Sequence, residues 1–270
     1  MADRTMSEVF RSDNLVVRTR LPHGSTRVIV TFAPWRSDPG LERPGFGEEF
    51  LAAHELDGIH VTCAGNDWYQ YPEMPEAYEA IRRAAAPYES LITYGVSMGG
   101  YQAIKAAAPL NARRVLAISP QASVDPSKAP FETRWPEAKD IDFIDDEIVR
   151  SDARYVVVYD PRSPLDAAHA RMICAVVGDR YKVVMPFAGH WVLRTWKEAH
   201  FITKATLTLL KSKRDTAGVR RMFRELRRDS PSYIGEMIAL GRLSPAMEAA
   251  LKAQQAALLS LPHAAGEDAA

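Results

Sequence analysis

The stretch from Ser90 to Lys105 constrains the fold more than any other part of the chain. Its first half, residues 91–94, is short, apolar and β-branched, which predicts a buried strand. From Ser97 onward, Ala, Ile and Lys recur at helical spacing. Between the two lies Gly95-Val-Ser-Met-Gly99, so the chain must pass from strand to helix within very few residues. We expect the backbone of Ser97 to be strained and its hydroxyl to project above the sheet edge.

The sharp turn requires glycine at positions where a side chain would not fit. A Cβ at Gly95 or Gly99 would collide with the neighbouring strand or helix, and Gly100 lets the helix pack close to the sheet. The strand before the motif and the helix after it are the context that a nucleophile turn requires. The alternative is a tight turn in which Ser97 only caps the helix.

Strand-like and helical segments alternate along most of the chain. This alternation predicts an α/β fold, with a mostly parallel central sheet and helices on both faces. Strands are expected at 14–20, 27–32, 58–63, 91–94, 114–119, 154–159 and 180–185, and helices at 48–56, 75–86, 97–105, 164–176 and 198–211. Ligands of such sheets bind beyond the carboxyl ends of the strands, so residues that follow strands are the first candidates for a site.

The pattern divides the chain into a sheet domain over residues 1–212 and an α-helical appendage over residues 213–270. Within the first, residues 121–151 are rich in proline and lack core periodicity, which indicates a lid-like insertion. Beyond Asp215 no strand-like segment remains, and a loose tail is expected from His263. The C-terminal helices are a candidate surface for self-association into a homo-oligomer.

Composition excludes several classes of partner. Lys and Arg total 34, as do Asp and Glu, so no excess charge favours nucleic acid or an anionic membrane. No run of about 18 apolar residues occurs, so we expect no membrane span and a cytoplasmic protein. The sequence has no G-x-G-x-x-G or Walker-type loop, so no cofactor is expected. The acidic residues between 140 and 147 are typical of a solvated face, and no metal is expected.

A serine hydroxyl is a poor nucleophile at neutral pH and needs a base within hydrogen-bond reach, a role that histidine suits best. Of the seven histidines, His190 lies in a small loop with Gly189, between a predicted strand and a helix. The others lie in predicted strands, helices, an early turn or the tail: His23, His54, His60, His169, His200 and His263. We predict His190 as the base; the alternative is a loop histidine that caps the next helix.

The base in turn needs a carboxylate that fixes its tautomer and stabilises its cation. Asp160 ends the predicted strand 154–159, where a carboxylate would be rigidly placed and partly desolvated. We predict Asp160 as this acid, with Asp166 and Asp125 as alternatives. The non-catalytic interpretation is a turn aspartate before Pro161.

The chain order Ser97, Asp160, His190 resembles the α/β-hydrolase superfamily, whose triads run serine, acid, histidine. The segment 160–164, Asp-Pro-Arg-Ser-Pro, is similar to the acid loop of that family. The resemblance covers about residues 14–212. It implies the α/β-hydrolase fold, a nucleophile elbow at Ser97 and a covalent acyl-enzyme.

The same resemblance implies an oxyanion hole that uses the backbone N–H of Met98, the residue after the nucleophile. A second donor is expected from the loop after strand 27–32. There the chain departs from the usual His-Gly pattern, and Pro34 has no N–H to donate. We predict Ala33 as the second donor, with Trp35 as the alternative.

Aromatic residues gather in the predicted loops. They could stack on a sugar face or line an acyl pocket; the alternative is that they only anchor the fold. The residues assigned to substrate binding are Trp35, Trp68, Tyr69 and Trp135. The segments around Ser97, 119–126 and 130–135 look like a little-characterised bacterial branch of the superfamily whose members tend to accompany surface-polysaccharide enzymes, which implies acylated sugars.

The sequence therefore predicts a serine hydrolase that acts on a small-molecule carboxylic ester or thioester through an acyl-enzyme on Ser97. Water or a hydroxyl would accept the acyl group, so an acyltransferase is included in this prediction. The first alternative is a catalytically weak hydrolase-like scaffold that serves in surface-polysaccharide assembly. The second is a flavodoxin-like binding domain.

Overall fold

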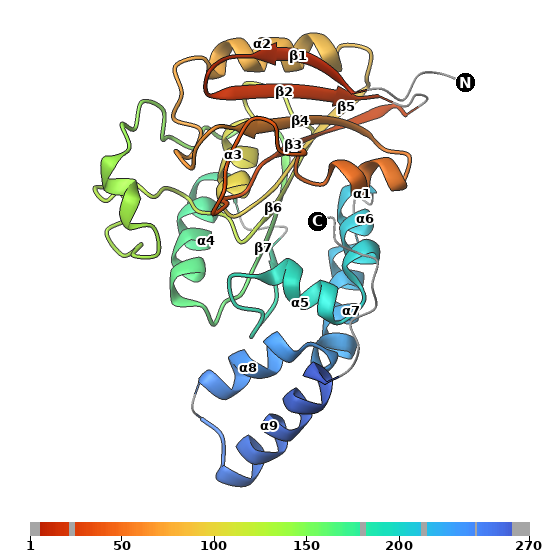
Figure 1. Ribbon diagram of the computed structural model, residues 1–270, viewed down its shortest axis with the longest axis vertical. Helices are drawn as coiled ribbons and strands as arrows, with labels where there is room; N and C mark the ends of the chain where they lie inside the picture. The colour runs from red at the N-terminus through yellow and green to blue at the C-terminus, as the bar shows by residue number, and fades with distance from the viewer. Residues whose placement is uncertain (1–5, 22–24, 179–181, 212–214, 241, 261–270) are drawn as a thin grey trace.

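One eight-stranded sheet runs through the part of the chain that the computed structural model describes, which is residues 6–21, 25–178, 182–211, 215–240 and 242–260. The strand order is β1-β2-β4-β3-β5-β6-β7-β8 (Figure 1). The strands are β1 (Ser7–Arg11), β2 (Leu15–Arg20), β3 (Arg27–Phe32), β4 (Asp57–Cys63), β5 (Ser90–Val96), β6 (Arg114–Ile118), β7 (Arg154–Tyr159) and β8 (Lys182–Val184). The predicted tail from His263 lies outside the described residues.

The sheet is parallel except at one edge. Strand β2 pairs antiparallel with both β1 and β4, and the pairs from β4 through β3, β5, β6 and β7 to β8 are parallel. Strand β6 is buried at every position, and β3 at every position but its first, as expected for strands covered on both faces. The prediction of a mostly parallel α/β sheet is confirmed.

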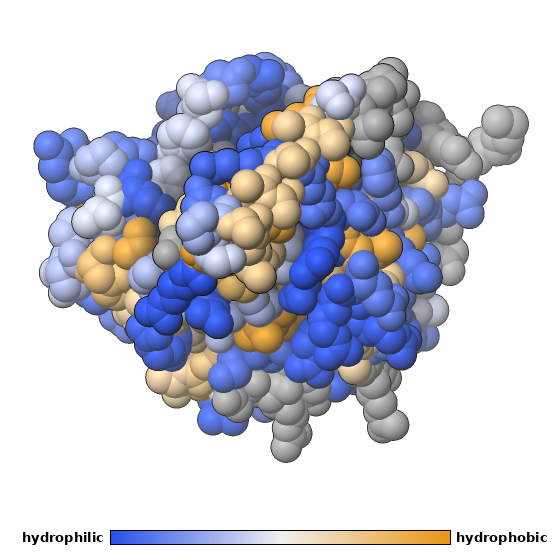
Figure 2. Space-filling model, turned by 90° about the horizontal axis from the view of Figure 1, so that it is seen from below, coloured by the Kyte–Doolittle hydropathy of each residue, from blue (hydrophilic) through white to orange (hydrophobic). Residues whose placement is uncertain are grey.

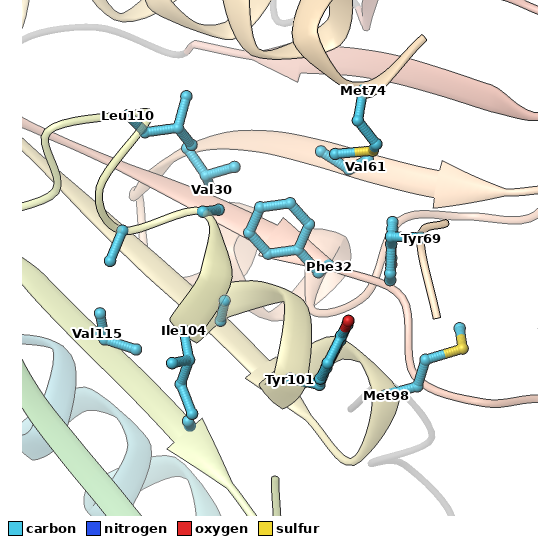
Figure 3. Packing of buried hydrophobic residues seen from close by; sticks show 14 of the residues in the cluster. Val30, Phe32, Val61, Tyr69, Met74, Met98, Tyr101, Ile104, Leu110 and Val115 are labelled. Carbon is cyan, nitrogen blue, oxygen red and sulfur yellow. The ribbon is translucent and has the colours of Figure 1, made fainter. Parts of the chain in front are cut away.

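Helices cover both faces of the sheet (Figure 1). Helices α2 (Met74–Ala85), α3 (Met98–Lys105) and α4 (Pro164–Val177) pack on one face, in a cluster that includes Phe32 and Tyr101. Figure 3 shows Phe32 at the centre of this packing, between Val30, Tyr69 and Tyr101. The other face holds α1 (Glu48–Ala53), α5 (Val192–Glu198) and α6 (Ile202–Lys211).

The C-terminal helices belong to this second core. They are α7 (Thr216–Leu226), α8 (Pro231–Ala239) and α9 (Pro245–Leu259). Phe223 and Tyr233 are buried in the same cluster as Trp196 of α5. Glu198, at the end of α5, accepts hydrogen bonds from the hydroxyls of Ser230 and Ser232, at 2.6 and 2.8 Å, and so fixes the start of α8 against the sheet domain.

The end of the molecule that α8 and α9 form (Figure 1) carries apolar residues on its surface. Leu240, Met247 and Leu259 are among the exposed large hydrophobic side chains. Figure 2, which views the molecule from this end, shows a band of apolar surface between hydrophilic side chains. Self-association through this surface stays a prediction.

The insertion 121–151, drawn in green at the left of Figure 1, contains a short 3₁₀ turn over residues Pro136–Asp140 and is anchored to α3. Asp146 accepts hydrogen bonds from the hydroxyls of Tyr101, at 2.7 Å, and Ser123, at 2.5 Å. The buried amine of Lys105 lies 3.0 Å from the carboxylate of Asp145. Because Tyr101, Lys105 and Asp146 are buried, the insertion is fixed to the domain at this point.

Candidate active site

Ser97 lies in the sharp turn between β5 and α3. Its backbone has φ 53° and ψ −121°, a conformation that non-glycine residues rarely adopt. The backbone N–H of Ser97 donates to the carbonyl of Ile118 on β6, at 2.9 Å, and the carbonyl of Ser97 accepts from the N–H of Tyr101, at 2.9 Å. These bonds hold the strained turn in place, as the sequence predicted for the central serine of the motif.

The two glycines of the motif allow backbone segments to approach closely. A Cβ at Gly95 would meet the backbone of Gly99 and Gly100, and a Cβ at Gly99 would meet the carbonyl of Phe32 at the end of β3. Both contacts are with backbone atoms, which cannot swing away as a flexible side chain can. The predicted reason for these glycines is confirmed.

Replacing Gly99 by Ala is therefore expected to destabilise the protein by about 3 kcal/mol, because α3 must move away from β3 to admit the methyl group. Denaturant unfolding measures the change. Gly40→Ala is the matched control, since a Cβ there meets nothing within 4 Å. Equal unfolding free energies for the two variants would contradict the close approach.

His190 meets Ser97 at the carboxyl edge of the sheet. Its Nε2 lies 3.0 Å from Oγ of Ser97, and its Nδ1 lies 2.9 Å from Oδ1 of Asp166. Gly189, which precedes it, has φ 63°, a left-handed conformation that suits glycine and lets the loop turn. The structure thus brings together the predicted nucleophile and the predicted base, and joins them to Asp166.

The carboxylate that contacts Nδ1 of His190 is that of Asp166, the alternative offered by the sequence, and not that of the predicted acid Asp160. The carboxylate of Asp160 accepts the backbone N–H of Gly189, at 2.8 Å, and that of Arg162, at 2.7 Å. It therefore holds the loop that carries His190, and its oxygens point at backbone amides. Burial raises its pKa, although those two hydrogen bonds oppose the rise.

Asp166 comes from the first turn of α4 and is 1% exposed. Burial alone would raise its pKa, but the hydrogen bond and charge of His190, together with the charge of Arg134, hold the pKa below its ordinary value. Nδ1 of His190 lies 2.9 Å from both Asp166, which can only accept when ionised, and a nitrogen of Arg134, which can only donate. In the tautomer that uses the contact with Asp166, Nδ1 carries the proton. Nε2 is then free to accept the hydroxyl proton of Ser97.

Three further polar residues, all from the insertion, contact Ser97, Asp166 or each other, and no motif in the sequence points to them. Nε2 of Gln121 donates to Oγ of Ser97, at 3.1 Å. A guanidinium nitrogen of Arg134 donates to Oδ1 of Asp166, at 2.8 Å, and Glu132 pairs with Arg134 at 2.6 Å. The insertion therefore contributes side chains to the wall of the site.

The oxyanion donors predicted from the sequence differ in their availability. Met98 is the first residue of α3, where a backbone N–H has no partner within the helix. The prediction of Ala33 as the second donor is wrong. Its N–H already donates to the carbonyl of Val61, at 3.1 Å, and so continues the pairing of β3 with β4. Pro34 has no N–H, so Trp35 remains the candidate from this loop.

Only some of the predicted aromatic residues face the site. The ring of Trp135 lies 6.3 Å from that of His190 and 5.3 Å from that of Trp35, and both tryptophans are partly exposed. Trp68 and Tyr69 are 0% and 3% exposed and pack in the core, so their assignment to substrate contact is wrong for this structure. Trp191, which was not selected, is 61% exposed and its ring lies 5.7 Å from that of His190.

Within the described ranges no group of three or more His, Cys, Asp or Glu residues is arranged to hold a metal ion. No helix among those residues has the length and hydrophobicity needed to cross a membrane.

No protein-family model and no curated protein sequence matches the chain. Among solved structures, the chain is similar to an α/β serine hydrolase without a lid from Xanthomonas campestris, XC6422, with a TM-score of 0.46 and 15% identity over 80% of this chain and 96% of that one. It is also similar to a sugar hydrolase from Lactococcus lactis, YeeB, with a TM-score of 0.52 and 11% identity over 82% of this chain and 100% of that one. A third similar structure is the glycosylation-associated Gap123 complex from Streptococcus agalactiae, with a TM-score of 0.56 and 16% identity over 75% of this chain and 46% of that one. At these identities the similarity concerns the fold.

Proposed function

We propose that this chain, which has the fold of the α/β-hydrolase superfamily, is a serine hydrolase or acyltransferase that acts on carboxylic esters or thioesters. The observation that carries the proposal is the continuous series of contacts from Oγ of Ser97 through both ring nitrogens of His190 to Asp166, at 3.0 and 2.9 Å. A hydroxyl, an imidazole and a buried carboxylate in this order make up the machinery of acyl transfer.

In the proposed reaction, Nε2 of His190 takes the proton of Ser97 as Oγ bonds to the carbonyl carbon of the ester. The carbonyl electron pair moves to oxygen, and the oxyanion accepts the N–H of Met98, with Trp35 as the proposed second donor. Collapse of this intermediate breaks the bond to the alcohol, which leaves with the proton held on Nε2. The acyl group remains on Ser97, and Asp166 stabilises the imidazolium in each half-reaction.

The acyl-enzyme is then released by a second nucleophile. Water gives a carboxylic acid, whereas a substrate hydroxyl gives a new ester; in both cases Nε2 of His190 takes the proton of the attacking group and returns it to Oγ. Trp191 and Trp135 provide aromatic surface beside His190, which suits the apolar face of a sugar ring or an acyl chain. Acylated sugars are our proposed substrate class, in keeping with the sugar hydrolase of similar fold.

A fluorophosphonate probe tests the proposal without knowledge of the substrate. We expect the folded protein to be labelled and Ser97→Ala to lose all labelling, because the probe phosphonylates an activated serine. Ser163→Ala is the control, since Ser163 makes no capping hydrogen bond at the start of α4. Absence of labelling in the folded wild-type protein would favour the scaffold alternative, and labelling that survives in Ser97→Ala would place the nucleophile elsewhere.

A further inference from the structure

The insertion 121–151 places a buried ion pair directly against the catalytic acid. Arg134 donates to Oδ1 of Asp166, at 2.8 Å, the same oxygen that His190 contacts at 2.9 Å. Two nitrogens of Arg134 donate to the carboxylate of Glu132, and the shorter of these contacts is 2.6 Å. The side chains of Glu132 and Asp166 are each 1% exposed and that of Arg134 is 22% exposed, so solvent screens these charges only in part.

The hydrogen bonds of His169 and Glu132 indicate the protonation state of each. Nδ1 of His169 accepts the backbone N–H of Ala122, at 3.2 Å, so the ring proton is on Nε2. That Nε2 donates to Glu132, at 2.8 Å. Burial opposes ionisation of Glu132, but the hydrogen bonds from His169 and Arg134 outweigh it and lower the pKa of Glu132 to about 2. Glu132 is therefore an anion beside a neutral His169.

The charges of this group have a consequence for His190. Arg134 alone would cancel the charge of Asp166, and its nitrogen lies 2.9 Å from Nδ1 of His190, where a cation opposes formation of the imidazolium. Glu132 adds the negative charge that Arg134 removes. With neutral His190 the group carries one net negative charge, and with the imidazolium it is neutral.

We propose that Glu132 and Arg134 are positioning residues that together set how readily His190 takes up a proton: Arg134 orients Asp166, and Glu132 neutralises Arg134 so that the charge of Asp166 stays available to His190. This inference rests on the proposed function. It makes the insertion an electrostatic part of the active site, and it assigns a role to two residues that contact neither the nucleophile nor the reacting atoms.

Two other acids approach the loop of His190 from different elements. Asp160 accepts the N–H of Gly189, at 2.8 Å, and a Cβ on Gly189 would lie 2.8 Å from the carboxylate of Glu236 on α8. Burial raises the pKa of both acids. Arg162 lies over the ring of Phe187 in the same loop. These groups are unchanged in variants of the insertion, so they contribute equally to every protein compared below.

The test is the rate of fluorophosphonate labelling of Ser97 as a function of pH, because that rate requires neutral His190. In Glu132→Gln the charge of Arg134 is no longer compensated and disfavours the imidazolium. The acid limb of the pH–rate profile, where the rate falls as His190 is protonated, is therefore expected to move to lower pH by about one unit. In Arg134→Gln the two carboxylates favour the imidazolium, so the limb is expected to move to higher pH by a similar amount. The double variant is expected to return close to the wild-type position, and Arg134→Lys, which keeps the charge, to stay there.

Opposite shifts that cancel in the double variant are the result expected from an electrostatic role. Lower rates with an unmoved limb, or shifts in one direction in both variants, would overturn the inference while leaving Ser97-dependent labelling, and hence the proposed function, intact. A wild-type protein that is not labelled at any pH would overturn both. If Glu132→Gln does not fold, the direction of the shift in Arg134→Gln decides.

Discussion

Replacing Asp166 by Asn is expected to lower kcat/KM on an activated ester by about 10,000-fold and to lower the free energy of unfolding by about 1–3 kcal/mol, because Arg134 loses a buried, charged partner. The carboxamide has the shape of the carboxylate but no charge, so it neither stabilises the imidazolium of His190 nor enforces the tautomer that leaves Nε2 free to accept. Hydrolysis of a p-nitrophenyl ester and thermal unfolding measure the two effects.

Asp160→Asn is the matched control for this prediction. Asp160 holds the backbone N–H groups of Gly189 and Arg162, and a carboxamide can accept only one of them while turning an NH₂ toward the other. We expect a loss of about 1–3 kcal/mol of stability and a fall in activity far smaller than that of Asp166→Asn. A larger catalytic loss in Asp160→Asn would return the acid to the position predicted from the sequence.

This pair of aspartates shows where sequence reasoning reached its limit. Both follow β7, and the rule that catalytic groups follow strands favoured Asp160, which comes immediately after it. Which carboxylate meets His190 depends on how the loop 187–190 is folded, and Asp160 is itself used to fold that loop. The acidic residue in the first turn of α4 is equally typical of a helix start, so no local pattern singles out Asp166.

The parts of the site that could be predicted are those with a local geometric requirement. The strand, the glycines and Ser97 had to form a sharp turn, and His190 had to follow a strand in a glycine-containing loop. Gln121, Glu132 and Arg134 could not be found in this way, because they lie in a segment without periodicity. Their positions depend on long-range anchors such as Asp146.

The fold followed from hydrophobic pattern for the buried strands, which are long apolar runs, and failed where that pattern is weak. Strand β1 was not predicted, because it is an exposed edge strand with sequence Ser-Glu-Val-Phe-Arg. Helix α5 also differs from the prediction: the sequence pattern indicates a helix from Glu198, whereas α5 ends at Glu198 and α6 starts at Ile202. Tertiary burial of Trp196 and Phe201 stabilises this break.

Replacing Asp146 by Ala is expected to lower the free energy of unfolding by about 3 kcal/mol or more and to slow fluorophosphonate labelling of Ser97. Asp146 is the acceptor for the hydroxyls of Tyr101 and Ser123, and the amine of Lys128 lies 3.4 Å away. Removing the carboxylate leaves two buried donors without their acceptor, at about 1–3 kcal/mol for each. Thermal unfolding and the labelling rate measure these two effects, and limited proteolysis of residues 121–151 reports whether the insertion is released.

The neighbouring residue supplies the control. The side chain of Glu147 is 79% exposed and pairs only at the surface with Lys128, at 2.7 Å, so Glu147→Ala is expected to leave the melting temperature and the labelling rate close to wild type. If the insertion were a freely opening lid, Asp146→Ala and Glu147→Ala would behave alike. If it is a fixed wall that carries Gln121, Glu132 and Arg134 into the site, only Asp146→Ala should release it, and loss of labelling should accompany loss of protection from the protease.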